Sequence, residues 1–158
     1  MRTFADASFA DDLLKRFNTG AHIVFVAGGA ILWKSKKQTF VASSTTEAEF
    51  ANLLPAAQSA LWVARILEEA GAPQPKPTIL YTDSLNAQTV ALNPNNSART
   101  RNLDIRYKWV IDRVSKGQID LQHLPGDKMV ADGLTKPLVL DKHVKFVKML
   151  GMASCRVP

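Results

Sequence analysis

The chain has 158 residues, of which 46% are hydrophobic and 22% charged, so it has the composition of a globular protein and the length of about one domain. Its single cysteine, Cys155, excludes an internal disulfide framework and a zinc site built only from cysteines. Lysine and arginine outnumber aspartate and glutamate by 20 to 14, and the resulting net charge of +6 favours a polyanionic partner such as nucleic acid. No apolar run approaches the roughly 20 residues that a membrane-spanning helix needs.

The N-terminal quarter of the chain predicts a strand followed by a β-hairpin. Residues 22–26 and 31–34 are apolar and flank Gly28-Gly29, a pair that is typical of tight hairpin turns. A strand is also predicted over residues 4–9, and residues 38–42 extend the hairpin or add a strand. The polar segment 11–20 between them is predicted as a turn.

Helices and strands alternate in the rest of the chain. Apolar residues at 3.6-residue spacing predict an amphipathic helix over residues 45–69, which Gly71 and Pro73 end. The later predicted elements are a strand over 78–82, a short helix from Asp83-Ser84 that ends before Pro94, a helix over 103–116, a strand over 118–123, and helices over 130–135 and 141–150. This order predicts an α/β domain with one mixed sheet over residues 1–152, followed by a flexible tail over 153–158.

Four acidic residues lie in apolar strands or at the boundaries of elements. They are Asp6, Glu49, Asp83 and Asp132. A carboxylate inside an apolar strand is costly unless it is paired or binds a cation, and several carboxylates facing one point would repel each other. Oxygen-rich clusters of this kind suit Mg²⁺ or Mn²⁺. One alternative stays open for Asp83, because aspartate is also a preferred residue at the start of a helix.

The motifs around these acids resemble the ribonuclease H domain of copia-type retrotransposon polyproteins. They are, in order, Ala5-Asp-Ala-Ser8, Ser44-Thr-Thr-Glu-Ala-Glu49, Tyr81-Thr-Asp-Ser84 and Val130-Ala-Asp-Gly-Leu-Thr-Lys136, with residues 30–41 and 99–109 as further similar stretches. The resemblance implies the ribonuclease H fold, in which three antiparallel and two parallel strands form one sheet flanked by helices. It also implies cleavage of the RNA strand of an RNA/DNA hybrid. Two contexts stay open, a polyprotein with a reverse transcriptase domain upstream and a standalone gene product. The expected location is intracellular, in the cytoplasm or a virus-like particle, with the nucleus left open.

By this resemblance Asp6, Glu49, Asp83 and Asp132 are the four catalytic, metal-binding carboxylates. Two Mg²⁺ ions, for which Mn²⁺ can substitute, would then support in-line attack that leaves 5′-phosphate and 3′-hydroxyl ends. Glu49 is preferred over Glu47, because Ser44-x-x-Glu47 forms a capping box that gives Glu47 a structural role.

Contacts to nucleic acid are expected from two groups of residues near this site. Ser8, Thr45 and Asn86 are candidate contacts to the minor groove, and Arg99, Arg101, Arg106 and Lys108 are candidate contacts to phosphates. Cellular ribonucleases H carry a histidine in the loop before the last carboxylate, and residues 125–130 have none; His123, just upstream, is interpreted as a structural residue of the strand. The alternative function is a domesticated, catalytically silent module of the same fold that binds nucleic acid or protein.

Overall fold

The computed structural model describes residues 1–8, 18–39, 42, 44–93 and 105–153, and the side chains of residues 105 and 106 are outside the described part. It contains one five-stranded sheet in the order β3-β2-β1-β4-β5. The strands are β1 (Arg2–Ser8), β2 (Thr19–Val26), β3 (Gly29–Lys37), β4 (Thr78–Thr82) and β5 (Ile119–His123). The first three are antiparallel neighbours, whereas β4 runs parallel to β1 and to β5. The mixed sheet that the sequence predicts is therefore confirmed, and β1 is its central strand.

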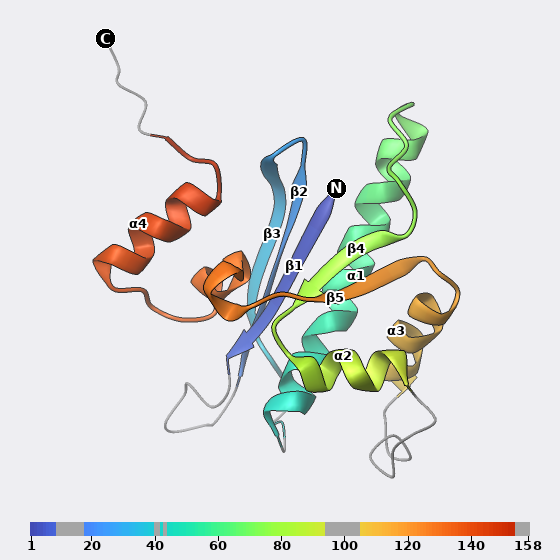
Figure 1. Cartoon of the computed structure of the whole chain (residues 1–158), viewed down its shortest axis with the longest axis horizontal. Coiled ribbons are helices and arrows are strands. Elements are labelled where there is room, and N and C mark those ends of the chain that lie inside the picture. Colours follow the sequence, from blue (N-terminus) through green and yellow to red (C-terminus); the bar gives the residue numbers. More distant parts are fainter. Residues whose placement is uncertain (9–17, 40–41, 43, 94–104, 154–158) are drawn as a thin grey trace.

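Helices cover both faces of this sheet (Figure 1). The helices on one face are α1 (Thr45–Glu69), α2 (Leu85–Leu92) and α3 (Ile105–Ser115), which enclose the larger apolar core with Leu53, Leu80 and Leu121. On the other face lie the short 3-10 helix η3 (Val130–Leu134) and α4 (Leu140–Met149), which pack over Phe4, Ile23 and Phe25. A second short 3-10 helix, η2 (Gly126–Lys128), connects β5 to η3. Both faces are thus covered near the strand ends where the acidic residues lie.

The helix α1 begins and ends where its sequence pattern predicts. The Ser44 hydroxyl accepts a hydrogen bond from the Glu47 N–H at 3.2 Å, as the first half of a capping box requires. The helix continues through Pro55 to Glu69, and its buried stripe of small and apolar residues lies on the sheet. One polar residue, Asn52, is buried in that stripe with 4% of its surface exposed.

The boundaries of several other elements differ from the sequence prediction. β2 begins at Thr19, so the prediction of a turn up to residue 20 was wrong there, because Gly20 and Thr19 pair with Ala7 and Ser8 of β1. β3 is longer than predicted and ends at Lys37. The segment after β5 forms a 3-10 helix over Val130–Leu134. Predictions for residues 9–17, 40–41, 94–104 and 154–158 concern parts of the chain outside the described residues.

Candidate metal centre

Two of the four predicted acids meet because β1 and β4 are parallel neighbours. Their register pairs Ala5 with Thr82, so Asp6 and Asp83 follow at the same end of adjacent strands. Asp6 lies inside β1 and is 5% exposed, whereas Asp83 comes directly after β4. The alternative role of Asp83 as a helix cap does not hold, because Ser84 is the N-cap of α2 and accepts a hydrogen bond from the Ala87 N–H at 3.2 Å.

The third acid, Glu49, lies in the first turns of α1, the helix that covers the face of the sheet opposite to η3. Its carboxylate accepts a backbone hydrogen bond from Ala7. One turn further along the helix, the Asn52 amide donates to the main-chain oxygens of Asp6 and Ala21, at 2.8 Å each. This pair of bonds fastens α1 to β1 and β2 beside the acids. A Cβ on Gly20 would clash with the Asn52 side chain, so any larger residue there would displace the amide that makes these two bonds.

Asp6, Glu49 and Asp83 form one cluster, in which one carboxylate oxygen from each lies within 4.8 Å of the others. Burial is the main reason that the pKa of Asp6 is raised to about 6, while the Thr135 hydrogen bond opposes this shift and the charges of Asp83 and Asp132 add to it. Burial, followed by the charges of Asp6 and Asp83, raises the pKa of Glu49 to about 9. The pKa of Asp83 is also raised, first by burial. Three carboxylates therefore share a place where their charged forms are destabilised.

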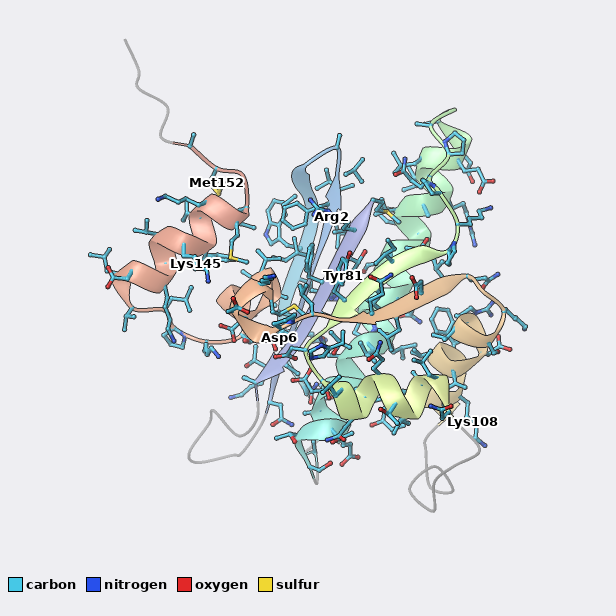
Figure 2. All side chains as sticks on the ribbon, viewed as in Figure 1. Arg2, Asp6, Tyr81, Lys108, Lys145 and Met152 are labelled. Carbon is cyan, nitrogen blue, oxygen red and sulfur yellow. The ribbon has the colours of Figure 1, made fainter. Side chains whose placement is uncertain are left out.

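Asp132 lies at the side of this cluster. Its charge raises the pKa of both Asp6 and Asp83, but it is not among the three acids whose oxygens lie within 4.8 Å. Its carboxylate forms an ion pair with Lys136, four residues along the chain. The Thr135 hydroxyl, from the residue that follows η3, donates to Asp6 Oδ2 at 2.6 Å. Figure 2 shows Asp6 at the lower end of the sheet, where η3 approaches it.

Three residues around the cluster were not predicted from the sequence: Asn52, Thr135 and Lys136. Asn52 carried no signal in the sequence, because its burial in the helix stripe is visible only in the folded chain. Thr135 and Lys136 stand in the motif that was used only for Asp132. His123 lies in β5, as the sequence predicts; it is exposed at the end of that strand, and its charge lowers the pKa of Asp83.

The donor set of the cluster fits a divalent cation with a preference for oxygen ligands. Three carboxylates from β1, α1 and the end of β4 converge, and their raised pKa values show that positive charge would stabilise the ionised forms. The hydrogen bond that the Asp6 carboxylate accepts comes from a neutral hydroxyl, which does not balance its charge. Mg²⁺ and Mn²⁺ both match this chemistry.

The predicted contacts to nucleic acid are dispersed around this end of the sheet. Thr45 and Asn86 are exposed at the starts of α1 and α2. Ser8 ends β1, and its hydroxyl accepts a hydrogen bond from the Thr19 N–H at 3.2 Å. Lys108 is exposed on α3, apart from Asp6 in Figure 2. Arg99 and Arg101 are outside the described residues, as is the side chain of Arg106.

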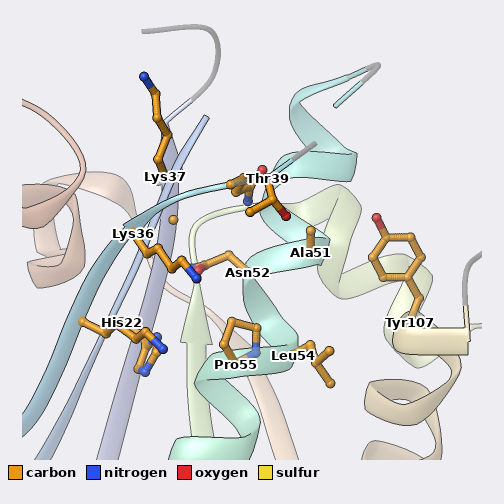
Figure 3. Close-up of a pocket in the computed structure, with 12 residues that line it drawn as sticks. His22, Lys36, Lys37, Thr39, Ala51, Asn52, Leu54, Pro55 and Tyr107 are labelled. Carbon is orange, nitrogen blue, oxygen red and sulfur yellow. The ribbon is translucent and has the colours of Figure 1, made fainter. Parts of the chain in front are cut away.

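A basic cavity of about 250 Å³ lies between β3, α1 and α3 (Figure 3). Lys34, Lys36 and Lys37 line it from the strand, and Asn52 and Tyr107 line it from the helices. His22 at its base is 2% exposed and its Nε2 lies 2.9 Å from Ser59 Oγ; burial, followed by the charge of Lys34, lowers its pKa to about 4. The histidine is therefore neutral at pH 7, and the lysines supply the positive charge of this cavity.

Comparison with known proteins places the chain among transposon sequences. No protein-family model matches it. It is 32% identical over 154 residues to the retrovirus-related Pol polyprotein from transposon TNT 1-94 of Nicotiana tabacum, which covers 98% of this chain and 12% of the polyprotein. It is 30% identical over 158 residues to the polyprotein from transposon RE1 of Arabidopsis thaliana, covering 100% of this chain and 11% of that one. The chain thus spans about a tenth of the length of these relatives.

Solved structures with a similar fold are ribonucleases H. RNase H1 from the halophilic archaeon Halobacterium salinarum NRC-1 superposes with a TM-score of 0.58 at 13% identity, covering 85% of this chain and 92% of that one. LC11-RNase H1 in complex with an RNA/DNA hybrid superposes with a TM-score of 0.54 at 11% identity, covering 90% and 97%. At these identities the likeness concerns the fold.

The sheet order and its flanking helices therefore define a protein of the ribonuclease H fold. Its relatives make the assignment narrower: the chain belongs with the ribonuclease H-like domains of copia-type retrotransposon Pol polyproteins. Within the described residues, every helix is too short or too polar to cross a membrane.

Proposed function

We propose that the chain is a metal-dependent endoribonuclease that hydrolyses the RNA strand of RNA/DNA hybrids, as part of a Pol polyprotein that also holds a reverse transcriptase. The observation that carries this proposal is the convergence of Asp6, Glu49 and Asp83 at one strand end. The transposon relatives and the hybrid bound by a protein of the same fold support the choice of substrate.

In this proposal Asp6, Glu49 and Asp83 hold Mg²⁺ or Mn²⁺, with Asp132 as a fourth carboxylate at the side. Two such ions would lower the pKa of the attacking water and stabilise the leaving 3′-oxygen, giving 5′-phosphate and 3′-hydroxyl ends. The protein contributes the fixed positions of its acids: Asn52 holds the main chain of Asp6, and the parallel register of β1 and β4 holds Asp83 beside it.

The substrate would lie across the open end of the sheet, held by basic and polar groups on both sides. Lys36 and Lys37 at the end of β3 can meet phosphates from one side. Thr45 and Asn86 are exposed at helix starts, where hydroxyl and amide groups can reach 2′-hydroxyls. The arginines at 99, 101 and 106 complete the proposed phosphate contacts.

A gel assay tests the proposal directly. Labelled RNA/DNA hybrid, duplex RNA and duplex DNA are each incubated with the chain in Mg²⁺, in Mn²⁺ and in EDTA, with Asp83→Asn as the inactive control. Cleavage of only the RNA strand of the hybrid, only with metal, is expected. Metal-bound wild-type chain that binds hybrid without cutting it would instead favour the silent binding module.

A further inference from the structure

Thr135 contacts the site from the far end of the chain. Its hydroxyl lies 2.6 Å from Asp6 Oδ2, although 129 residues separate the two. Both residues are 5% exposed, so water does not compete for this hydrogen bond as it would at a surface. A buried hydrogen bond to a carboxylate is among the stronger kinds in proteins.

The Thr135 hydroxyl has one proton, and the described residues place two acceptors within its reach. The main-chain oxygen of Asp132 lies 3.1 Å away, and the Asp6 carboxylate lies at the shorter distance. The charged, nearer acceptor takes the proton. The Thr135 N–H also lies 3.3 Å from the Asp132 oxygen, which closes the turn that carries Asp132. Thr135 therefore donates hydrogen bonds to both Asp6 and Asp132, through its hydroxyl and its main-chain N–H respectively.

The remaining freedom of Asp6 lies in its side chain. Asn52 already holds the main-chain oxygen of Asp6, so only rotation about the side-chain bonds could turn the carboxylate. The Thr135 hydroxyl opposes that rotation and uses one lone pair of Oδ2, and the other lone pairs of the carboxylate stay available to a cation. Because threonine is β-branched, its side chain has few χ1 rotamers, which helps to keep the hydroxyl in the position from which it donates.

We propose that Thr135 is a positioning residue of the metal centre, whose hydroxyl orients the Asp6 carboxylate and fastens the Asp132 turn to the central strand. The inference rests on the proposed function, since it concerns the same acids. Residues that orient metal ligands in this way typically change metal affinity by about 10–100-fold when they are removed.

The test measures metal binding without nucleic acid. Isothermal titration of the chain with Mn²⁺ and with Mg²⁺ is made for the wild type, Thr135→Val and Thr135→Ser. Valine keeps the shape and loses the proton, so we expect metal to bind at least about 10-fold more weakly. Serine keeps the hydroxyl and should stay near the wild type. Thr89→Val is the matched control, because Thr89 is exposed on α2 and, among the described residues, its hydroxyl donates to the Leu85 oxygen of its own helix.

The outcomes separate positioning from mere packing. Thermal unfolding in EDTA shows whether each variant is folded, and hybrid cleavage across a metal titration should show Thr135→Val recovering activity at higher Mg²⁺. Wild-type metal affinity in Thr135→Val would overturn the inference, even if that variant were less stable. If the valine variant does not fold, equal affinities in Thr135→Ser and Thr135→Ala would overturn it. A wild-type chain that binds metal but leaves hybrid intact refutes only the proposed function.

Discussion

Replacing Glu49 with glutamine should stabilise the metal-free chain at alkaline pH. Burial and the neighbouring acids raise the pKa of Glu49 to about 9, against an ordinary value of 4.5. Between these two pH values the folded chain holds a proton that the unfolded chain has released. The free energy of unfolding therefore falls as the pH rises from 4.5 towards 9, and a neutral amide at this position removes that loss.

The magnitude follows from the size of the shift. At pH 8 the wild type is 3.5 pH units above the ordinary pKa of Glu49, which corresponds to about 5 kcal/mol at 1.36 kcal/mol per unit. Relaxation of the side chain and entry of water reduce this upper limit, so we expect a gain of about 1–3 kcal/mol. For a chain of this length each 1 kcal/mol changes Tm by about 2–4 °C.

Differential scanning calorimetry in EDTA, at steps between pH 5 and pH 9, measures this effect. The Tm of Glu49→Gln should equal that of the wild type near pH 5 and exceed it increasingly above pH 6. Added Mg²⁺ should raise the Tm of the wild type more than that of the variant, because bound ligand stabilises the folded state. Glu47→Gln, two residues earlier in the same helix, is the control and should show no such gain. A Tm difference that is constant from pH 5 to pH 9 would refute the reasoning.

Three further predictions concern catalysis, capping and substrate binding. Asp83→Asn should cut hybrid at less than a tenth of the wild-type rate with its fold intact, as gel assays and circular dichroism would show; a higher rate contradicts its role as a ligand. Ser44→Ala removes the acceptor for the Glu47 N–H and should lower stability by about 1 kcal/mol in thermal unfolding, while cleavage stays near the wild type. Neutralising Arg99 and Arg101 together should weaken hybrid binding and reduce the slope of log K against log salt by about 0.7–0.9 for each phosphate that the chain no longer neutralises. An unchanged slope would assign phosphate binding to the lysines of β3 instead.

Local patterns in the sequence were enough to place most of the scaffold. The stripe of α1 and the apolar run of β4 have the same bounds in the sequence prediction and in the structure, because helical periodicity and strand alternation are local properties. β2 was predicted too short because Thr19 and Gly20 resemble turn residues, and only their pairing with β1 makes them a strand. Long-range pairing decides such boundaries and leaves no local signal.

In the candidate site too, some residues were predictable from local motifs and others depend on long-range contacts. The motifs identified Asp6, Glu49 and Asp83, and the parallel register of β1 and β4 explains why two of them meet. The residues that hold these acids could not be assigned from the sequence. Asn52 and Thr135 act through hydrogen bonds to Asp6 from positions 46 and 129 residues away, and nothing in their own neighbourhoods indicates those partners.

Because β1 is the central strand, its partners in the sheet and in the acidic cluster come from residues much later in the chain. Within these residues β1 precedes every other strand, yet β4, the parallel neighbour of β1, begins only at Thr78. The Asp6 carboxylate gains its hydroxyl partner only when residue 135 has been added. A copy whose reading frame stops after β5 would contain all five strands but lack Asp132 and Thr135. Such a truncated copy would lose the side of the acidic cluster that η3 supplies, so the integrity of the last part of the frame controls any chemistry that the cluster performs.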